Sequence, residues 1–190
     1  VFVVRGADDA TVTDALDAAQ AALTAVDQGS SSDEQRPGTI REGISAATQA
    51  ETPANLVAIS IAGTYAPVVA EQALRDGLHV LCFSDNVDVA DELRLKTLAV
   101  EKRLLMMGPD CGTAIIDGVP LGFANVVAKG SVGIVAASGT GAQEVSRLLD
   151  TAGVGVSQLI GGGGRDLSAD IGRRADRLIA DIKAAGDNGA

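Results

Sequence analysis

The chain has 190 residues, of which 46% are apolar and only 2% aromatic, and its formal net charge at pH 7 is −10. This composition excludes a disordered chain, and a sequence pI of about 4.4 excludes the basic surface that nucleic-acid binding requires. No apolar run approaches the roughly 18 residues of a membrane span. We therefore expect a cytoplasmic protein that binds neither nucleic acid nor a membrane.

The N-terminus and the cysteines narrow this expectation. The opening VFVVRGADD is too short and too acidic for a signal peptide, and a first residue other than Met is typical of a fragment. Two cysteines and one histidine are too few for an ordinary zinc site, so we predict no metal. Cys82 and His79 lie in the apolar run HVLCF, where a buried, inert thiol and a structural histidine are expected.

The first fifty residues read as a strand, a helix, a loop and a second helix. VFVV is the predicted strand, and the first helix is predicted over 8–26, with Asp8 or Thr11 as its N-cap. A segment rich in Ser, Gly and Pro follows over 27–38 and predicts a loop. The second helix is predicted over 39–50.

A regular alternation of strands and helices begins near residue 55. Apolar runs of four to seven residues alternate with helical patterns of ten or more, which indicates βαβ units and a parallel sheet covered on both faces. The strands are predicted over 55–61, 79–83 and 104–107, and the helices over 64–76 and 87–103. Because the carboxyl ends of parallel strands share one edge, where ligands collect, we expect a site formed by the loops over 62–67, 84–87 and 108–113.

The loop MGPDCGT at the end of the third of these strands is stiff. Pro109 restricts the backbone and Gly112 allows the bend, which places Asp110 and Cys111 at the sheet edge. A nucleophilic Cys111 needs a neighbouring base, and the sequence offers none.

A hairpin and a second βα series complete the chain. Asp117-Gly118 between two apolar runs predicts a hairpin, which we interpret as a covering ribbon or a connector. A boundary near Lys129-Gly130 divides the chain into predicted domains over 1–129 and 130–190. The second series is predicted as a strand over 131–137, a helix ending at Ala152, a strand over 156–160 and a polar helix over 167–185.

The turn Ser138-Gly139-Thr140-Gly141 opens the helix of the second series. Backbone N–H groups at a helix N-terminus, together with the helix dipole, favour a phosphate or carboxylate. No Lys follows the turn and the GxGxxG spacing is absent, so it is neither a Walker motif nor a dinucleotide fingerprint. The alternative is a serine N-cap with glycines that permit a tight turn.

Four glycines, 161–164, follow the last strand of that series. Such a run lets the backbone approach a ligand closely, and its alternative is a flexible connector. Gly162 and Gly163 are expected to face the serine turn, since both loops lie on the same strand edge. Arg165 is expected to pair with an anion, or with Asp166 or Asp170.

Together these motifs resemble the FdrA family of acyl-CoA synthetase-like proteins, which are similar to the alpha subunit of succinyl-CoA synthetase. The resemblance covers about 55–168 and rests on SDNVDVADELRLKTLAVEKRLLMMGPDCGTAIIDGVPLGFANVV, GIVAASGTGAQEVSRLL and IGGGGRDLS, in that order. It implies an α/β fold: a Rossmann-like CoA-binding domain with a parallel sheet, followed by part of a flavodoxin-like domain. It also implies a subunit that binds a small molecule and works with a partner subunit or as a homo-oligomer.

The resemblance assigns roles to the loops. The turn 138–141, with Gly162 and Gly163 opposite, is implied to hold a phosphoryl or similar oxyanion group. The implied CoA-binding residues are Gly63, Thr64, Ser84, Asp85, Asn86, Pro109, Asp110 and Cys111. FdrA-like proteins are also linked with oxamate carbamoyltransferase chemistry in ureide breakdown, for which carbamoyl phosphate is the ligand.

The sequence departs from succinyl-CoA synthetase at several points. VVRGADDA holds one glycine where the relative has its first glycine-rich loop, and GPDC replaces GPNC. His79 does not match the phospho-accepting histidine, and no ATP-grasp domain is present. These departures favour the alternative function, a non-catalytic CoA- or nucleotide-binding module that needs partner chains.

Overall fold

The computed structural model describes residues 8–28 and 37–165 of the chain. The chain divides into two units, 1–36 and 37–190, each described here by itself. The strand predicted over VFVV and the helix predicted over 167–185 lie outside the described residues, as does most of the loop predicted over 27–38.

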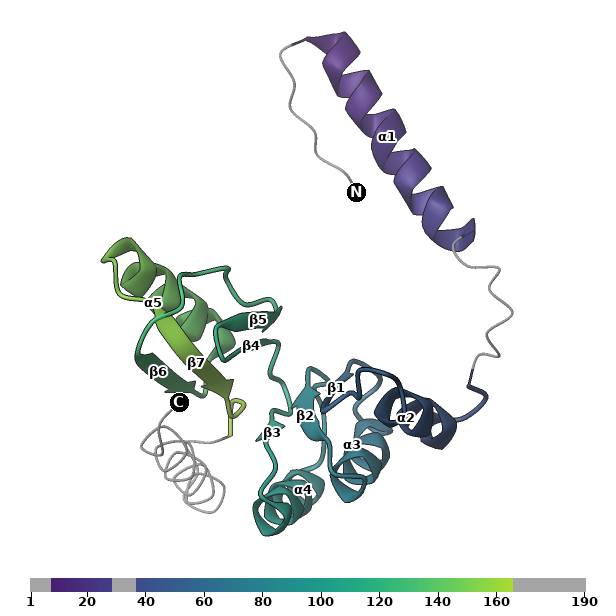
Figure 1. Cartoon of the computed structure of the whole chain (residues 1–190), viewed down its shortest axis with the longest axis vertical. Helices are drawn as coiled ribbons and strands as arrows, with labels where there is room; N and C mark the ends of the chain where they lie inside the picture. The colour runs from purple at the N-terminus through teal and green to yellow at the C-terminus, as the bar shows by residue number, and fades with distance from the viewer. Residues whose placement is uncertain (1–7, 29–36, 166–190) are drawn as a thin grey trace. The chain divides into compact units, whose positions relative to one another are not determined.

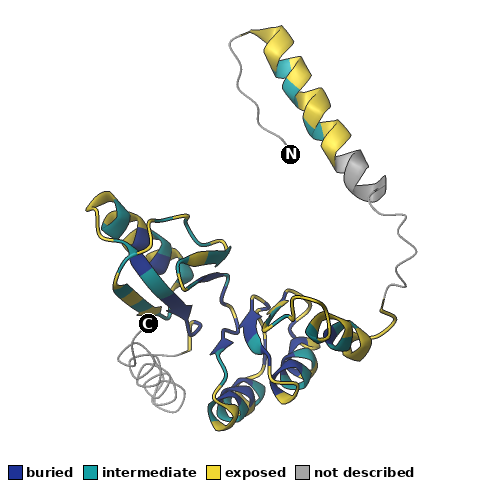
Figure 2. Ribbon diagram, in the orientation of Figure 1, coloured by how far each residue is buried: buried dark blue, intermediate teal, exposed yellow. Residues whose placement is uncertain are grey.

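The first unit contains helix α1 (Asp9–Gln28), which confirms the first predicted helix (Figure 1). Asp8 provides the cap, because its Oδ1 accepts hydrogen bonds from the backbone N–H of Thr11 at 2.9 Å and from its hydroxyl at 2.7 Å. These two bonds stabilise the carboxylate and lower the pKa of Asp8 below its usual value. Where its burial is described, α1 is largely exposed (Figure 2).

The second unit begins with helix α2 (Ile40–Thr48) and a parallel sheet of three strands. Thr39 and Glu42 form a capping box that starts α2. The sheet has the order β1-β2-β3, and α3 and α4 are the crossover helices (Figure 1). The bounds are β1 Leu56–Ile59, α3 Ala66–Arg75, β2 His79–Cys82, α4 Val89–Lys102 and β3 Met106–Met107.

Both faces of this sheet are covered, as the apolar strands predict. Val80 belongs to a core cluster that also contains Leu74 of α3 and Leu95 of α4. The neighbouring residue Leu81 points to the opposite face, because side chains alternate along a strand, and it packs with Met107 and with residues of the second sheet. Figure 2 shows buried residues on β2 and β3 and on the helices α3 and α4.

The second sheet has the order β5-β4-β7-β6 and is mixed. β6 and β7 are parallel, whereas β4 runs antiparallel to both β5 and β7. Helix α5 packs against one face of this sheet, where Ala142 clusters with Ile115 and Leu159. The bounds are β4 Thr113–Ile116, β5 Val119–Gly122, β6 Val132–Ala136, α5 Gly139–Thr151 and β7 Val156–Gly161.

The predicted hairpin is present, with positive φ at both Asp117 and Gly118. Its interpretation as a covering ribbon or a connector is wrong, because β4 and β5 are strands of the second sheet. The physical reason is that both faces of β4 are apolar: Ala114 packs toward the first sheet and Ile115 toward α5. The α/β class is confirmed, while the domain boundary near Lys129-Gly130 stays a prediction.

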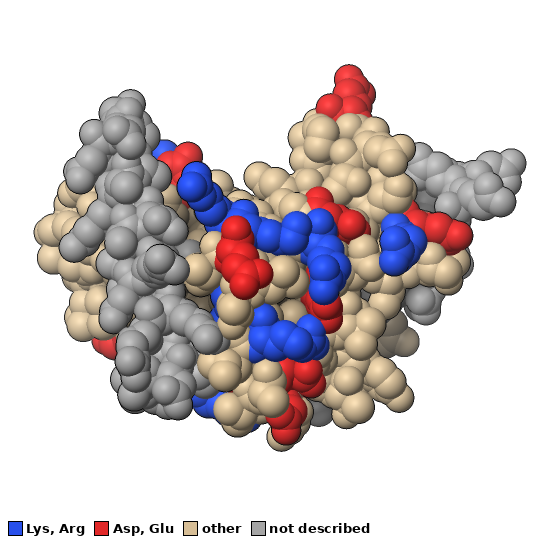
Figure 3. Space-filling model, turned by 90° about the horizontal axis from the view of Figure 1, so that it is seen from below, with Lys and Arg blue, Asp and Glu red and all other residues tan. Residues whose placement is uncertain are grey.

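The outer surface of α3 and α4 carries charges of both signs. Arg94 pairs with Glu71 and, at 3.0 Å, with Asp91, and Arg75 lies 2.6 Å from Glu71. Hydrogen bonds from the two guanidinium groups, first that of Arg75, lower the pKa of Glu71. Figure 3 shows basic and acidic side chains interleaved on this side of the molecule.

Candidate functional site

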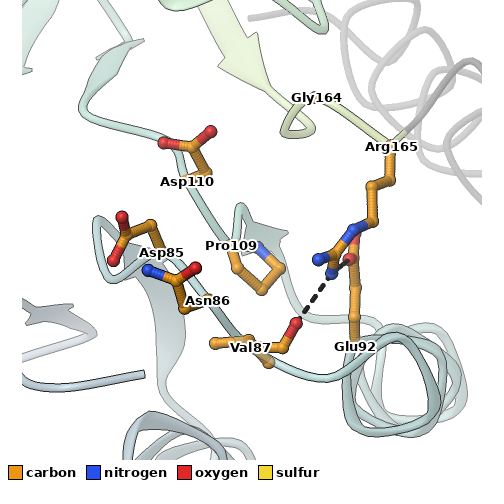
Figure 4. Close-up of a pocket in the computed structure, with 8 residues that line it drawn as sticks. All are labelled: Asp85, Asn86, Val87, Glu92, Pro109, Asp110, Gly164 and Arg165. Carbon is orange, nitrogen blue, oxygen red and sulfur yellow. Dashed lines mark hydrogen bonds and ion pairs between the residues drawn. The ribbon is translucent and has the colours of Figure 1, made fainter. Parts of the chain in front are cut away.

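A cavity of about 260 Å³ opens at the carboxyl ends of β2 and β3, beside the first turn of α4. Two of the three loops that were expected to form a site, 84–87 and 108–113, supply most of its wall. The loop over 62–67 supplies none of it. The lining residues are Asp85, Asn86, Val87, Glu92, Pro109, Asp110, Gly164 and Arg165 (Figure 4).

Backbone hydrogen bonds hold the two loops side by side. The N–H of Asp110 donates to the carbonyl of Ser84 at 3.0 Å, and the N–H of Cys111 donates to the carbonyl of Cys82 at 3.1 Å. Asn86 and Asp110 both have positive φ, at 53° and 56°, which Asn and Asp tolerate better than most residues. The Gly108-Pro109 peptide is cis.

The predicted CoA-binding residues fall into two groups. Asp85, Asn86, Pro109 and Asp110 line the cavity. The other four, Gly63, Thr64, Ser84 and Cys111, do not.

Three of these four have a visible place in the framework. Gly63 is needed where the chain passes the loop 84–87, since a Cβ there would lie 2.0 Å from the carbonyl oxygen of Asp85. The buried hydroxyl of Ser84 accepts the N–H of Ile61 at 3.0 Å. Cys111 is buried, and its thiol donates to the carbonyl of Thr113 at 3.5 Å.

A buried charge network forms one wall of the cavity. Glu92 is only 1% exposed, and its Oε1 lies 3.0 Å from the Nζ of Lys96 while its Oε2 accepts from Arg165 at 2.9 Å. Lys96 also donates to the carbonyl of Gly162 at 2.7 Å, and Arg165 donates to the carbonyl of Val87 at 2.8 Å. The network therefore ties α4 to the segment that follows β7.

This network was not predicted from the sequence. The signal was present in the i,i+4 spacing of Glu92 and Lys96. Arg165 was expected to pair with an anion or with Asp166 or Asp170. In the structure its partner is Glu92, and both aspartates lie outside the described residues.

The glycine segment packs against the end of β6 and against the loop that follows β3. Gly162 and Gly163 are buried, and the N–H of Gly162 donates to the carbonyl of Ala136 at 3.0 Å. Gly163 has φ +95°, and a Cβ there would lie 2.3 Å from the carbonyl oxygen of Pro109. Gly163 thus permits a close approach of backbone to backbone, and of the four glycines only Gly164 lines the cavity.

The serine turn lies at the start of α5 and does not line the cavity. Ser138 is its N-cap, because the hydroxyl accepts the N–H of Gly141 at 3.2 Å. The Oγ atoms of Ser138 and Thr140 lie 3.4 Å apart. The N-cap interpretation is therefore confirmed, and the anion-binding interpretation, which the cap does not exclude, stays a prediction.

Cys82 and His79 have structural surroundings. Cys82 is buried, as expected, and burial raises the pKa of its thiol to about 11, which disfavours the reactive thiolate. The Nδ1 of His79 accepts the N–H of Leu105 at 2.9 Å, and burial lowers the pKa of this histidine. Across 8–28 and 37–165, no cluster of three or more His, Cys, Asp or Glu side chains suits a metal ion, and no helix is long and apolar enough to span a membrane.

The chain is similar in sequence to several known proteins, although no protein-family model matches it. It is 62% identical over 118 residues to the uncharacterized protein YahF of Escherichia coli, which covers 62% of this chain and 23% of YahF. It is 30% identical over 126 residues to the ADP-forming succinate–CoA ligase subunit alpha 2 of Archaeoglobus fulgidus, covering 64% of this chain and 44% of that subunit. The chain thus spans less than half the length of these relatives.

A solved structure shows the same fold. The ATP citrate lyase of Methanosaeta concilii, solved in complex with (3S)-citryl-CoA, matches with a TM-score of 0.57 at 19% identity, over 64% of this chain and 22% of the lyase. This likeness supports the Rossmann-like α/β architecture. The predicted similarity to the alpha subunit of succinate–CoA ligase is confirmed, whereas membership of the FdrA family stays a prediction.

Proposed function

We propose that this chain is the CoA-binding module of an FdrA-like acyl-CoA synthetase. One observation carries the proposal: the loops 84–87 and 108–113 converge on a cavity at the carboxyl edge of a parallel sheet. Ligands of open α/β sheets bind at this edge. The similarity to an alpha subunit of succinate–CoA ligase supports CoA as the ligand.

The lining residues suit one end of a CoA molecule. CoA presents hydroxyl, amine and amide donors as well as phosphate groups, and the wall offers both acceptors and donors. Asp85 and Asp110 are exposed carboxylates, Asn86 both donates and accepts, and Arg165 donates. A volume of about 260 Å³ is near the lower end of ligand pockets, which span roughly 300–1,000 Å³, so the cavity takes part of the ligand. When bound, CoA would supply the thiol that carries an acyl group.

The turn at the start of α5 is the proposed site for a phosphoryl group. Ser138 caps the N–H of Gly141, which leaves the N–H groups of Gly139 and Thr140 in the first turn to donate to an oxyanion. Carbamoyl phosphate carries the same phosphate group. Carbamoyl transfer nevertheless rests on the resemblance alone, because neither the alpha subunit nor the lyase described above is named a carbamoyltransferase.

We expect a partner subunit to supply the chemistry, while this chain by itself binds the ligand. The similar Archaeoglobus protein is named an alpha subunit. Both cysteines are buried, and His79 uses Nδ1 to accept a backbone N–H. These observations favour the second candidate, a CoA-binding module without chemistry of its own, for the chain taken by itself.

Calorimetric titration of the 190-residue chain with CoA, phosphate and carbamoyl phosphate tests these proposals. We expect CoA to bind in the micromolar range and Asp85→Asn or Asp110→Asn to weaken it about tenfold, since a hydrogen bond to a charged group contributes about 1.5–3 kcal/mol. Asp91→Asn, an exposed carboxylate of α4 outside the cavity, is the matched control. Absence of CoA binding contradicts the proposal.

Phosphate binding is tested separately with Gly139→Leu. A Cβ at Gly139 would lie 3.4 Å from the Oγ1 of Thr113, which is an ordinary van der Waals contact. The Cβ is therefore accommodated, while the rest of the leucine side chain occupies the space at the turn. We expect loss of phosphate binding with nearly unchanged folding. Unchanged phosphate affinity would show that the turn is only a cap. Carbamoyl phosphate binding without CoA binding would favour the carbamoyltransferase interpretation.

A further inference from the structure

Arg165 has hydrogen-bond donors to spare at the cavity wall. Among the eight lining residues it carries the single positive charge, and both of its hydrogen bonds, to Val87 and Glu92, leave through Nη1. A guanidinium has five N–H donors in a planar fork. The Nε and Nη2 edge is therefore available to a ligand, and the side chain is 42% exposed (Figure 4).

Glu92 holds this guanidinium in place. Its carboxylate is buried in the first turn of α4, where it contacts Lys96 through one oxygen and Arg165 through the other. A buried carboxylate is tolerated only when it is paired. Glu92 therefore fixes the position of the guanidinium through Nη1 and leaves its other N–H groups unused.

The two ends of the cavity differ in charge. In Figure 4, Asp85 and Asp110 lie at one end of the drawn site, and Arg165 with Glu92 lies at the other, with Pro109 between them. A phosphate beside the two aspartates would be repelled, whereas a planar guanidinium binds phosphate oxygens in a bidentate manner. The aspartates suit hydroxyl and amine donors instead.

We propose that Arg165 is the residue of this cavity that binds a phosphate group of the ligand, and that Glu92 is the positioning residue that holds it there. The inference rests on the proposed function, because it assigns the phosphate end of a CoA-type ligand. It also names the orientation of that ligand: phosphate toward α4, hydroxyl or amine groups toward Asp85 and Asp110.

The test is a titration of the full chain with pyrophosphate, CoA and dephospho-CoA. We expect Arg165→Gln to weaken pyrophosphate and CoA binding at least tenfold, and Arg165→Lys to have an intermediate effect because the charge remains while the fork is lost. Arg147→Gln removes an exposed, ion-paired guanidinium from α5 and is the matched control. If the parent chain binds dephospho-CoA more weakly than CoA, the 3′-phosphate is assigned to Arg165. If it binds the two equally, the pyrophosphate is assigned to Arg165.

The role of Glu92 needs a readout that a loss of stability does not produce. In the parent chain we expect the Nε–Hε NMR signal of Arg165, identified by its absence in Arg165→Lys, to shift when pyrophosphate is added. In Glu92→Gln, kept below its melting temperature, we expect that shift to be lost and the affinity to fall. A folded Glu92→Gln variant with the parent shift and affinity would overturn the positioning role.

The outcomes separate the two proposals. CoA binding that is equal in the parent and in Arg165→Gln overturns the role of Arg165 and leaves the proposed function standing. Pyrophosphate binding that depends on Arg165, without any CoA binding, supports Arg165 and contradicts the proposed function. Binding of neither ligand by the parent chain overturns both.

Discussion

The chain contains two strand–loop–helix units that look alike and are used differently. After β2, Asp88 caps α4 by accepting the N–H of Ala90 at 2.8 Å, and after β6, Ser138 caps α5. The loop after β2 lies beside the loop after β3, and the two form a cavity with charged walls. The turn after β6 does not line this cavity. The glycine segment after β7 leaves the second sheet and packs against the loop that contains Pro109.

This difference shows that the segments beside a strand end decide whether a cavity forms there. Alone, the turn at Ser138 carries a stronger anion-binding pattern than the loop 84–87. The cavity nevertheless lies at the loop 84–87. The loop after the parallel strand β3 and the segment 161–165 also contribute residues to its wall. Gly164 and Arg165, which follow the second sheet, thus complete a site of the first sheet.

The largest expected effect comes from removing a side chain from the core that the two sheets share. Met107 has no exposed surface and lies in the cluster that joins Leu81 of the first sheet to Ile160 of the second. We expect Met107→Ala to lower the free energy of unfolding by about 2–5 kcal/mol, because it leaves a cavity in this shared core. Denaturant unfolding followed by circular dichroism measures this. Val126→Ala, at a residue that is 87% exposed, should change it by less than about 0.5 kcal/mol.

The same measurement shows whether the sheets act as one cooperative unit. We expect a single transition in the parent and in Met107→Ala. Two separate transitions would mean that the comparison is between independent domains.

The next effect concerns the glycine segment. Gly163→Ala places a Cβ against the carbonyl of Pro109 at a positive φ, so we expect a loss of roughly 1–3 kcal/mol in the free energy of unfolding. Gly164→Ala is the control, since nothing lies within 4 Å of a Cβ there. Thermal unfolding of both variants decides the matter. Equal melting temperatures would show that the segment does not pack against the first sheet in solution.

The smallest effect is a dependence on pH that belongs to the first sheet. Burial lowers the pKa of His79 below its ordinary value of 6.5, so the unfolded chain binds this proton more readily than the folded one. Stability is therefore full above the unfolded pKa and decreases as the pH falls through it. We expect stability to fall between pH 7.5 and 5.5 by about the net contribution of one hydrogen bond, roughly 0.5–1.5 kcal/mol, because a proton on Nδ1 breaks the bond from Leu105.

His79→Asn keeps a hydrogen-bond acceptor and removes the titration. Melting temperatures recorded across that range should be flatter for this variant than for the parent. Because His79 is the single histidine of the chain, the comparison is direct. An identical pH profile in the two proteins would show that another group is responsible.

The sequence by itself determined the elements and the edge of the sheet that carries the cavity. Apolar runs and helical spacing predict α1 and, between 37 and 165, the four helices and the strands. Four of the eight CoA-binding residues that the resemblance implies line the cavity. Local rules are sufficient here, since capping, periodicity and turn preferences act between residues that are close in the chain.

The tertiary structure alone decided which distant residues meet. Glu92 and Arg165 are separated by 73 positions, and Gly163 meets Pro109, which is distant in the chain as well. The local sequence pattern around these residues does not indicate which distant residue each of them contacts. The pairing of β4 with β7 makes the hairpin part of a sheet. The glycines that follow β7 lie beside the loop that contains Pro109. Glu92 is buried in the wall of the cavity and pairs with Lys96 of its own helix and with the distant Arg165, because a charge out of water must be paired.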